Sequence, residues 1–363
     1  MSPRVIVRGS VEHRVWQVLG WLCVLAVAVY VLGPGKDYLV LRWAQAVTLG
    51  IAILGLNLVT GYSGQVSLGH SAFFGIGAYT TMILVADHGW PFLATLPVAG
   101  AIGFAVGALV GLPALRIRDL YLTLVTLGIA LAFPSIVKKM ESLTGGGNGK
   151  TITVGKGDVP NGFRWKAPSW VPGHLADNAW IFVTVFLIAI VMFLLASNLV
   201  RSRVGRATVA MRDNEIGAIS SGINSSRVKV MAFAVSALWT AVGGGCFALA
   251  GSTIAPDSFG LQRSIELIAG LVIGGIATIV GPALGGVIVE FLPYLSFNAF
   301  PGPEAYVLYG LILIVLVFFM PGGIVAGVRL LRDKAVRVVP RLPEVRAESP
   351  IAVSSADDAA GVR

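Results

Sequence analysis

Charged residues are scarce in this sequence, and their scarcity excludes most kinds of soluble protein. They make up 12% of the 363 residues, about half of the roughly 25% that is usual in soluble domains. Hydrophobic residues reach 56%, and the mean hydropathy is +0.82. This composition excludes a globular enzyme held by one anchor and predicts a polytopic membrane protein.

Cysteines and clustered metal ligands are also lacking. Cys23 and Cys246 both lie in apolar runs, and the four histidines are scattered along the chain. We therefore expect neither a disulfide framework nor a metal site. The sequence has no Ser/His/Asp or HExxH arrangement, so we expect no catalytic residue and disfavour an intramembrane enzyme.

A nucleotide-binding loop is missing as well. The nearest approach to GxxxxGK[ST], GGGNGKT at 145–151, has the wrong spacing, so we expect no cofactor in this chain. The net charge of +9 occurs without a basic stretch interleaved with aromatic residues, which argues against a nucleic-acid partner. Lys and Arg kept on cytoplasmic loops account for the charge better.

Long apolar runs are what the sequence has instead. A helix needs about 20 residues to cross a bilayer, and the runs given below approach that length. The first follows Arg4, Arg8 and Arg14 and lacks a cleavage site, so we interpret it as an uncleaved span rather than a signal peptide. The eighth and ninth are short and meet at Gly281, so they form either two spans or one broken hairpin. The runs lie at 16–34, 38–60, 64–86, 91–113, 119–137, 178–200, 230–252, 264–280, 282–298 and 305–322.

The expected organisation is one transmembrane domain at 1–330 and a disordered tail at 331–363, which mixes prolines, charges and small residues. Two segments between spans are long, 138–177 and 201–229. Lys and Arg are more frequent on the side that would hold both termini and 201–229, so we expect that side to be cytoplasmic. Residues 138–177 would then form an external loop.

A polar, glycine-dense stretch interrupts the apolar runs, TGYSGQVSLGHSAFFGIGAY at 60–79. Polar side chains at membrane depth are costly unless they face a polar cavity or a partner helix. A broken or re-entrant element beside a translocation path would explain both the polarity and the glycines. A packing seam of small residues is the alternative, and a lone histidine is more often a structural hydrogen bonder than a proton relay. The candidate path residues here are Gln65, Ser67, His70 and Ser71.

A second glycine-rich stretch, GLVIGGIATIVGPALGG at 270–286, is similar in character. It lies five predicted spans after the first, and such an offset gives two halves of opposite orientation, as in transport proteins with inverted repeats. We therefore add Gly274 and Gly275 to the candidate path. The alternative is that glycine is simply frequent in membrane helices.

The segment 201–229 holds the strongest local signal. Within it, NEIGAISSGIN predicts a short helix capped by Asn214, with Glu215 in its first turn and Gly222 at its end. Held between two spans, this helix would form a compact cytoplasmic knob that fits a groove on another protein. An ordinary surface helix is the alternative.

Together these stretches resemble permease subunits of ABC importers for branched-chain amino acids, a type that is usually paired with a second, related permease. The resemblance covers about 16–330 and is more specific for the family than for the substrate. It rests on TGYSGQVSLGHSAFFGIGAY at 60–79, LYLTLVTLGIA at 120–130, TGGGNG at 144–149, VGRATVAMRDNEIGAISSGIN at 204–224, GGIATIVGPALGG at 274–286 and FMPGGIVAG at 319–327.

The resemblance implies an all-α, polytopic membrane fold with about ten transmembrane helices and an inverted repeat. It implies a multi-pass subunit of the bacterial cytoplasmic (inner) membrane, in contact with lipid and with a second permease as a heterodimer. ATP and Mg would be held by two separate ATP-binding subunits. An extracytoplasmic substrate-binding protein would deliver the substrate.

The resemblance also assigns roles to two segments. The segment 61–79 lies close to the translocation path in such permeases, and the loop matching NE..A...G docks into the ATP-binding subunits. The position after Ile216 is often Ala in the family but is Gly217 here, which loosens the helix by up to about 1 kcal/mol. The docking residues implied are Arg212, Asp213, Asn214, Glu215, Ala218 and Gly222.

The implied substrate is a branched-chain or other small amino acid. Urea or a short amide is an alternative, because related permeases serve such substrates and the binding protein usually selects between them. A self-sufficient secondary transporter is a further alternative. Such a transporter would keep several acidic groups in mid-membrane, whereas the apolar runs offer only Glu290 as a deep candidate.

The expected topology is testable by cysteine accessibility. Single cysteines placed at 150, 215 and 340 should label from outside at 150 and from the cytoplasm at 215 and 340, because of the charge asymmetry. Labelling of 150 and 215 from the same side would show that the predicted number of spans is wrong.

Overall fold

A computed structural model describes residues 4–7, 26, 29–32, 37–113, 119–151, 177–300, 302, 304–319 and 322–339. The chain forms two compact units, one of residues 26–330 and one of residues 1–25 together with 331–363. In the second unit, strand β1 (Arg4–Val7) pairs in parallel with β4 (Val336–Val339). The tail expected to be disordered from 331 therefore has regular structure as far as 339, and the rest of that expectation lies outside the described residues.

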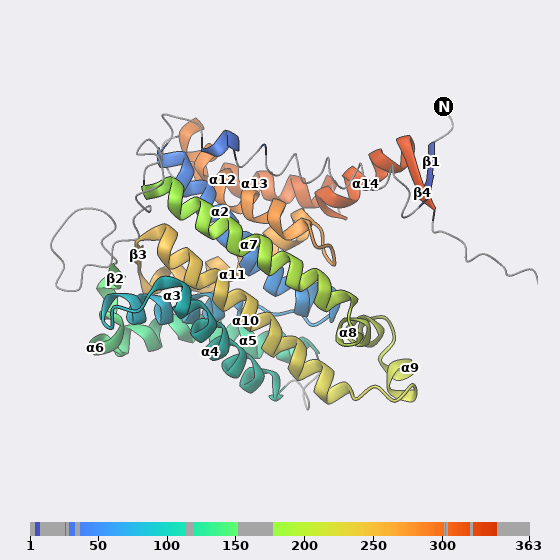
Figure 1. The fold of residues 1–363 in the computed structure, drawn as a ribbon, viewed down its shortest axis with the longest axis horizontal. Coiled ribbons are helices and arrows are strands. Elements are labelled where there is room, and N and C mark those ends of the chain that lie inside the picture. The colour runs from blue at the N-terminus through green and yellow to red at the C-terminus, as the bar shows by residue number, and fades with distance from the viewer. Residues whose placement is uncertain are drawn as a thin grey trace, which may run out of the picture. The chain divides into compact units, whose positions relative to one another are not determined.

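The unit of residues 26–330 is built mainly from helices (Figure 1). A short antiparallel pair, β2 (Lys150–Thr151) with β3 (Thr253–Ile254), joins two of its loops. The helices are α2 (Asp37–Leu56), the π-helix η1 (Asn57–Tyr62), α3 (His70–Ala86), α4 (Phe92–Gly111), α5 (Asp119–Lys139), α6 (Glu141–Thr144), η3 (Gly146–Asn148), α7 (Asp177–Arg201), α8 (Arg203–Asp213), α9 (Glu215–Ser220), α10 (Ser225–Gly251), η4 (Pro256–Phe259), α11 (Leu261–Gly274), α12 (Gly281–Ala299), α13 (Glu304–Phe319) and α14 (Gly323–Ala335), which continues past residue 330.

Several of these helices can cross a membrane, which confirms a polytopic, helical membrane protein. The apolar helices His70–Ala86 and Val307–Leu316 are shorter than a full span, and the predicted first span at 16–34 lies mostly outside the described residues. Within the described residues, five stretches are long and apolar enough: Tyr38–Tyr62, Phe92–Gly111, Tyr121–Lys139, Asp177–Arg201 and Ser225–Gly251.

Two predicted spans differ from the helices observed. The run at 64–86 is helical only from His70, because Ser63–Gly69 is irregular. The run at 264–280 also ends early, since Gly275–Val280 is irregular and separates α11 from α12. At 14 residues, α11 is shorter than the sequence pattern suggested and shorter than the roughly 20 residues that a span needs.

Helices α11 and α12 form an antiparallel hairpin. Gly270 of α11 lies against Gly285 of α12, and Gly274 lies against Gly281, so the two helices approach most closely at their glycines. Residues 264–298 therefore form two separate helices joined by an irregular turn, and the choice between two spans and one broken hairpin stays a matter of the expected topology.

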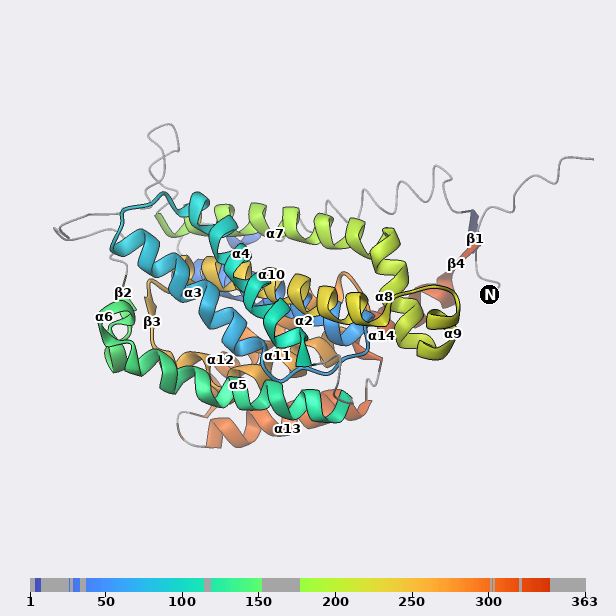
Figure 2. The same cartoon turned by 90° about the horizontal axis from the view of Figure 1, so that it is seen from below.

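Helix α10 lies at the centre of the 26–330 unit and packs against α2, α3 and α4 (Figures 1 and 2). Glycines make this packing possible. A Cβ at Gly77 of α3 would overlap with the carbonyl group of Ala241, and a Cβ at Gly244 would overlap with that of Phe74. Membrane helices commonly use small residues in this way to bring their backbones together.

The two ends of the 26–330 unit carry different structures (Figures 1 and 2). Helices α8 and α9 lie at one end, and α6 lies at the other end with the β2–β3 pair. The TGGGNG stretch forms the turn before β2, where a Cβ at Gly149 would overlap with the carbonyl group of Ile254. Positions 150 and 215, which we expect on opposite sides of the membrane, lie at opposite ends of this unit.

The close approach of α3 and α10 is testable by adding one methyl group. Gly244→Ala should lower the free energy of unfolding by about 1–3 kcal/mol, because the new Cβ forces the two backbones apart. Gly128→Ala on α5 is the matched control, since a Cβ there meets no described atom within 4 Å. The thermal midpoint of the purified protein in detergent measures both. Equal midpoints for the two variants would contradict the packing described.

Candidate functional site

The polar stretch that begins near residue 60 is a break between two helices. Helix α2 continues into η1, an irregular connection follows at Ser63–Gly69, and α3 begins at His70. This confirms the predicted broken element. A π-helical turn inside a longer helix is frequently found at functional sites.

The side chains of this connection alternate between two directions. Ser63, Gln65 and Ser67 are buried, whereas Val66 is 45% exposed. The polar side chains therefore point into the protein and the apolar one points away from it. In this conformation most of the polar groups bond each other or the neighbouring helices, as the packing-seam interpretation requires, and the Gln65 side-chain oxygen is the exception.

His70 joins the connection to α10 through a chain of hydroxyl groups. Its Nδ1 lies 2.9 Å from Ser67 Oγ, and its Nε2 lies 2.6 Å from Ser236 Oγ. Ser236 Oγ donates to the carbonyl oxygen of Gly55 at 2.7 Å, so the proton between Nε2 and Ser236 belongs to His70. This assignment follows from the hydrogen bonds. Both ring nitrogens are thus bonded to hydroxyls inside the protein, which suits a structural role better than a proton relay.

Ser71 and Gln65 have different surroundings. Ser264 Oγ of α11 donates to Ser71 Oγ at 2.7 Å and accepts from the Ser71 amide at 3.2 Å. Gln65 Nε2 donates to Ser63 Oγ at 2.7 Å, but its buried Oε1 has no hydrogen-bond partner within the described part of the chain. Of the four polar candidates, Gln65 is thus the one with an unused polar atom.

The second glycine-rich stretch contacts Asn57 of η1, the helical turn that leads into the first stretch. Gly274 and Gly275 are buried at the end of α11, and Gly275 has a φ of +124° that favours glycine. Asn57 Nδ2 donates to the carbonyl oxygen of Thr278 at 2.7 Å, and Asn57 Oδ1 accepts from the Ala277 amide at 2.9 Å. The two breaks predicted from a weak repeat therefore lie side by side.

Asn57 did not emerge from the sequence pattern, although a signal was present. It is a single amide within the apolar stretch ILGLNLVTGY at 53–62, and a polar side chain at that depth needs a partner. The partner lies about 220 residues away in the chain, where no local pattern points to it.

Helix α9 has the geometry predicted for NEIGAISSGIN. Asn214 caps α9, its Oδ1 accepting from the Gly217 amide at 2.9 Å, and Gly222 has a φ of +86° just beyond the helix. Glu215 accepts from Ser225 Oγ at 2.9 Å and pairs with Lys229 Nζ at 2.8 Å, which fastens α9 to α10. The hydrogen bond from Lys229 holds the pKa of the Glu215 carboxyl below its usual value.

The apolar side chains of α9 divide between the protein and its surroundings. Ala218 is buried, whereas Ile216 is 80% exposed and Ile219 is 50% exposed. Asp213, just before α9, pairs with Arg212. The Arg212 guanidinium also donates to the carbonyl oxygen of Gly61. The two isoleucines are candidate contact residues that the sequence pattern did not single out.

Glu290, the deep acidic candidate, has a partner within the chain. Arg42 Nη1 lies 3.0 Å from Glu290 Oε1, and the guanidinium lies over the rings of Tyr294 at 4.4 Å and Tyr38 at 5.0 Å. A carboxylate paired in this way is a poor site for a coupling ion, so the pair weakens the case for a self-sufficient secondary transporter.

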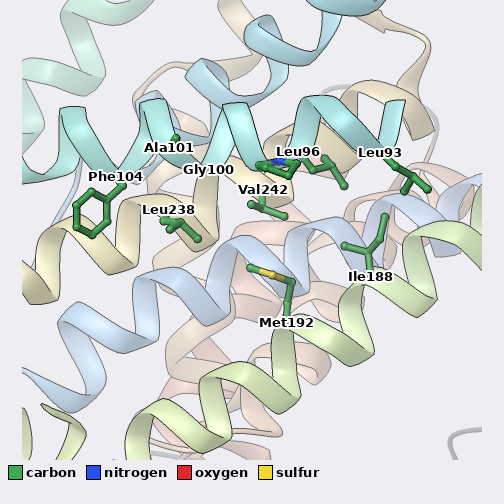
Figure 3. Close-up of a pocket in the computed structure, with 10 residues that line it drawn as sticks. Leu93, Leu96, Gly100, Ala101, Phe104, Ile188, Met192, Leu238 and Val242 are labelled. Atoms are coloured by element: carbon green, nitrogen blue, oxygen red, sulfur yellow. The ribbon is translucent and has the colours of Figure 1, made fainter. Parts of the chain in front are cut away.

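An apolar pocket of about 590 Å³ lies between α4, α7 and α10 (Figure 3). None of the six candidate path residues lines it, and its walls offer nothing that could bind the charged ends of an amino acid. It is therefore suited to apolar groups. Its lining consists of Leu93, Leu96, Pro97, Gly100, Ala101, Phe104, Ile188, Met192, Leu238 and Val242.

Comparison with known proteins gives a consistent result. The family model described as "Branched-chain amino acid transport system / permease component" matches residues 39–318. The branched-chain amino acid permease protein LivM of Escherichia coli is 30% identical over 76% of this chain and 67% of its own length. LivM of Salmonella typhimurium is 28% identical over 90% of this chain and 79% of its own length. LivH of E. coli is 25% identical over 79% of this chain and 95% of its own length. No solved structure matches the chain.

Gln65 gives the sharpest test of the candidate path. Gln65→Leu keeps most of the side-chain volume and removes an unpaired buried oxygen, so a purely structural role predicts unchanged or slightly higher stability. If Gln65 lines the path, uptake should fall about tenfold or more, which is ~1.4 kcal/mol in barrier height. Radiolabelled leucine uptake and co-purification of the complex measure the two effects.

Two further variants complete this test. Thr48→Val on α2 removes a buried hydroxyl that bonds the local carbonyl of Gln45, and it should leave uptake unchanged. Ser67→Leu should reduce uptake with assembly intact if Ser67 lines the path. Unchanged uptake in both Gln65→Leu and Ser67→Leu would show that the Ser63–Gly69 connection does not line the path. Failed assembly of Ser67→Leu would favour the packing-seam interpretation.

Proposed function

We propose that this chain, which belongs to the family of permease components of branched-chain amino acid transport systems, moves branched-chain or other small amino acids into the cytoplasm as one subunit of an ATP-driven importer. It is a transport component and not an enzyme. Family membership supports the permease role directly. The direction, the substrate and the partners in this chain are the further steps of the proposal.

The observation that best supports an ATP-driven mechanism is the rigid α9 element. It is capped by Asn214, ends at a residue with positive φ and is fastened to α10 through Glu215. With six residues it is too short to cross a membrane, yet it presents Ile216 and Ile219 to its surroundings. A short, fixed and partly apolar projection suits a groove on an ATP-binding subunit.

The remaining partners follow from the same reasoning. A second, related permease would complete the channel, since E. coli has two permease relatives with different names, LivM and LivH. Two ATP-binding subunits would dock at the α8–α9 end. A substrate-binding protein would dock at the opposite end, where α6 and the β2–β3 pair lie.

The finer features of the membrane fold are also proposals. We place both termini in the cytoplasm, count ten membrane elements with the short helices α3 and α11 among them, and relate the two halves as an inverted repeat. Asn57 of η1, just before the Ser63–Gly69 connection, contacts the Gly275–Val280 break. This contact supports the repeat, because matching interrupted helices meet at the binding region of many transporters. Gln65, Ser67, His70, Ser71, Gly274 and Gly275 remain the candidate path residues.

The docking role predicts that damage to α9 uncouples the complex without unfolding it. Glu215→Arg removes the bond with Lys229 and places a cation at a helix N-terminus, which costs about 0.3–1 kcal/mol locally. Gly222→Val puts a β-branched residue at a positive φ. Both variants should insert normally, lose the ATP-binding subunits on purification or fail to stimulate them, and lose most uptake.

Ser220→Ala is the matched control for these variants. Its hydroxyl donates to the carbonyl oxygen of Ile216 on the same short helix, and its loss should leave docking and uptake intact. Co-purification, ATP hydrolysis and leucine uptake are measured for all three variants. Wild-type values for both Glu215→Arg and Gly222→Val would mean that α9 is an ordinary surface helix.

A further inference from the structure

The Arg212 side chain bonds residues of its own chain. Its Nη1 donates to the carbonyl oxygen of Gly61 at 2.8 Å, while Nε and Nη2 donate to the carboxylate of Asp213. We propose that Arg212 and Asn57 are positioning residues that connect the α8–α9 element to the turn between α11 and α12. This inference rests on the proposed function, because it assigns a route by which docked ATP-binding subunits act on the membrane helices.

The first contact of this connection joins α8 to the end of η1. Arg212 lies in the last turn of α8, and its side chain covers Gly64, where an added Cβ would lie 2.8 Å from Arg212 Cγ. The bond from a guanidinium to the Gly61 carbonyl is charge-assisted, and such bonds are stronger than neutral ones. A rotation of α8 must therefore either break this bond or move η1.

The second contact lies within η1. A Cβ at Gly61 would overlap with Asn57 Oδ1 and lie 2.8 Å from the Ala277 amide nitrogen. Glycine at 61 thus leaves the space through which the Asn57 side chain reaches the α11–α12 turn. The Asn57 side chain is fully buried, so water does not compete for its bonds.

The third contact fixes the α11–α12 turn. The Asn57 amide pairs with both the Ala277 amide and the Thr278 carbonyl. Thr278 Oγ1 donates to the Gly275 carbonyl oxygen at 2.7 Å and accepts from the Gly281 amide at 3.1 Å. Ala277 has a φ of +55°, an unfavourable value for alanine that persists only where its surroundings hold it.

These contacts run from the α8–α9 element through the backbone of η1 and the Asn57 side chain to the second glycine-rich break. The Gly275–Val280 turn lacks regular helical hydrogen bonds, so it can change arrangement at less cost than the helices beside it. Coupling between distant sites requires an element with two arrangements that both sites bias. The α11–α12 turn is that element here, and Arg212 and Asn57 tie it to α8.

The test uses the complete complex in proteoliposomes, with leucine uptake and phosphate release measured on the same sample. Arg212→Gln and Asn57→Leu should each lower uptake per ATP hydrolysed, by roughly 5- to 150-fold, while the ATP-binding subunits still co-purify. Arg212→Lys, which keeps a charged donor, should recover part of the loss. The double variant should be no worse than the stronger single variant, because both residues act in one connection.

Arg206→Gln is the matched control. It removes the same charge from the same helix, but its guanidinium bonds the backbone of Arg201 rather than η1, so uptake per ATP should stay at the wild-type value. Because Arg212 is partly exposed, Arg212→Gln can decide the matter even if Asn57→Leu fails to assemble. Wild-type coupling in Arg212→Gln would overturn the inference. Loss of the ATP-binding subunits from that variant would also overturn it, since Arg212 would then act in docking.

A second readout separates this inference from the proposed substrate. Val280 is 61% exposed in the α11–α12 turn, so a cysteine there can be labelled once Cys23 and Cys246 are replaced. ATP should change the labelling rate at position 280 in the otherwise wild-type complex, and Arg212→Gln should abolish that change. A complex that takes up no leucine but retains the ATP-dependent change in labelling would contradict the proposed substrate and support the route through Arg212 and Asn57. A change in labelling that persists in Arg212→Gln would overturn that route.

Discussion

Polar groups within an apolar helical body must find partners inside the chain, because hydrocarbon offers none. This constraint accounts for most of the structure around the two helix breaks. The irregular connection at Ser63–Gly69 exposes backbone groups that a helix would have satisfied, and hydroxyls from α5, α10 and α11 bond this connection and the first residues of α3. His70 is held between two serines for the same reason, and Asn57 satisfies the backbone of a turn that has no helical bonds of its own.

The sequence predicts the features that depend on local chemistry. Apolar runs predict most of the helices, and the polar, glycine-dense composition of 60–79 predicts a break. The prediction of a short helix capped by Asn214 and followed by Gly222 at a positive φ is confirmed. Caps and positive φ values depend on neighbouring residues, so a local pattern can predict them. The family resemblance is carried by these same stretches.

The sequence does not predict which way a side chain points or which distant residue it contacts. Hydropathy counts apolar residues but does not say which side of a connection faces inward, so the burial of Gln65 and Ser67 beside an exposed Val66 had to be observed. Arg212 belongs to the docking loop by resemblance, yet its guanidinium reaches a carbonyl 151 residues earlier in the chain. The short length of α11 likewise depends on a turn held by Asn57, which no local pattern reveals.

The pair formed by Arg42 and Glu290 has a consequence for biosynthesis. The two residues are 248 positions apart, and at ribosomal rates of about 5–20 residues per second Glu290 is made roughly 12–50 s after Arg42. During that interval α2 is inserted with its guanidinium unpaired, and its face toward α12 must be covered by lipid or by the insertion machinery. A chain that ends before α12 therefore leaves the Arg42 guanidinium without the carboxylate that pairs with it in the folded protein.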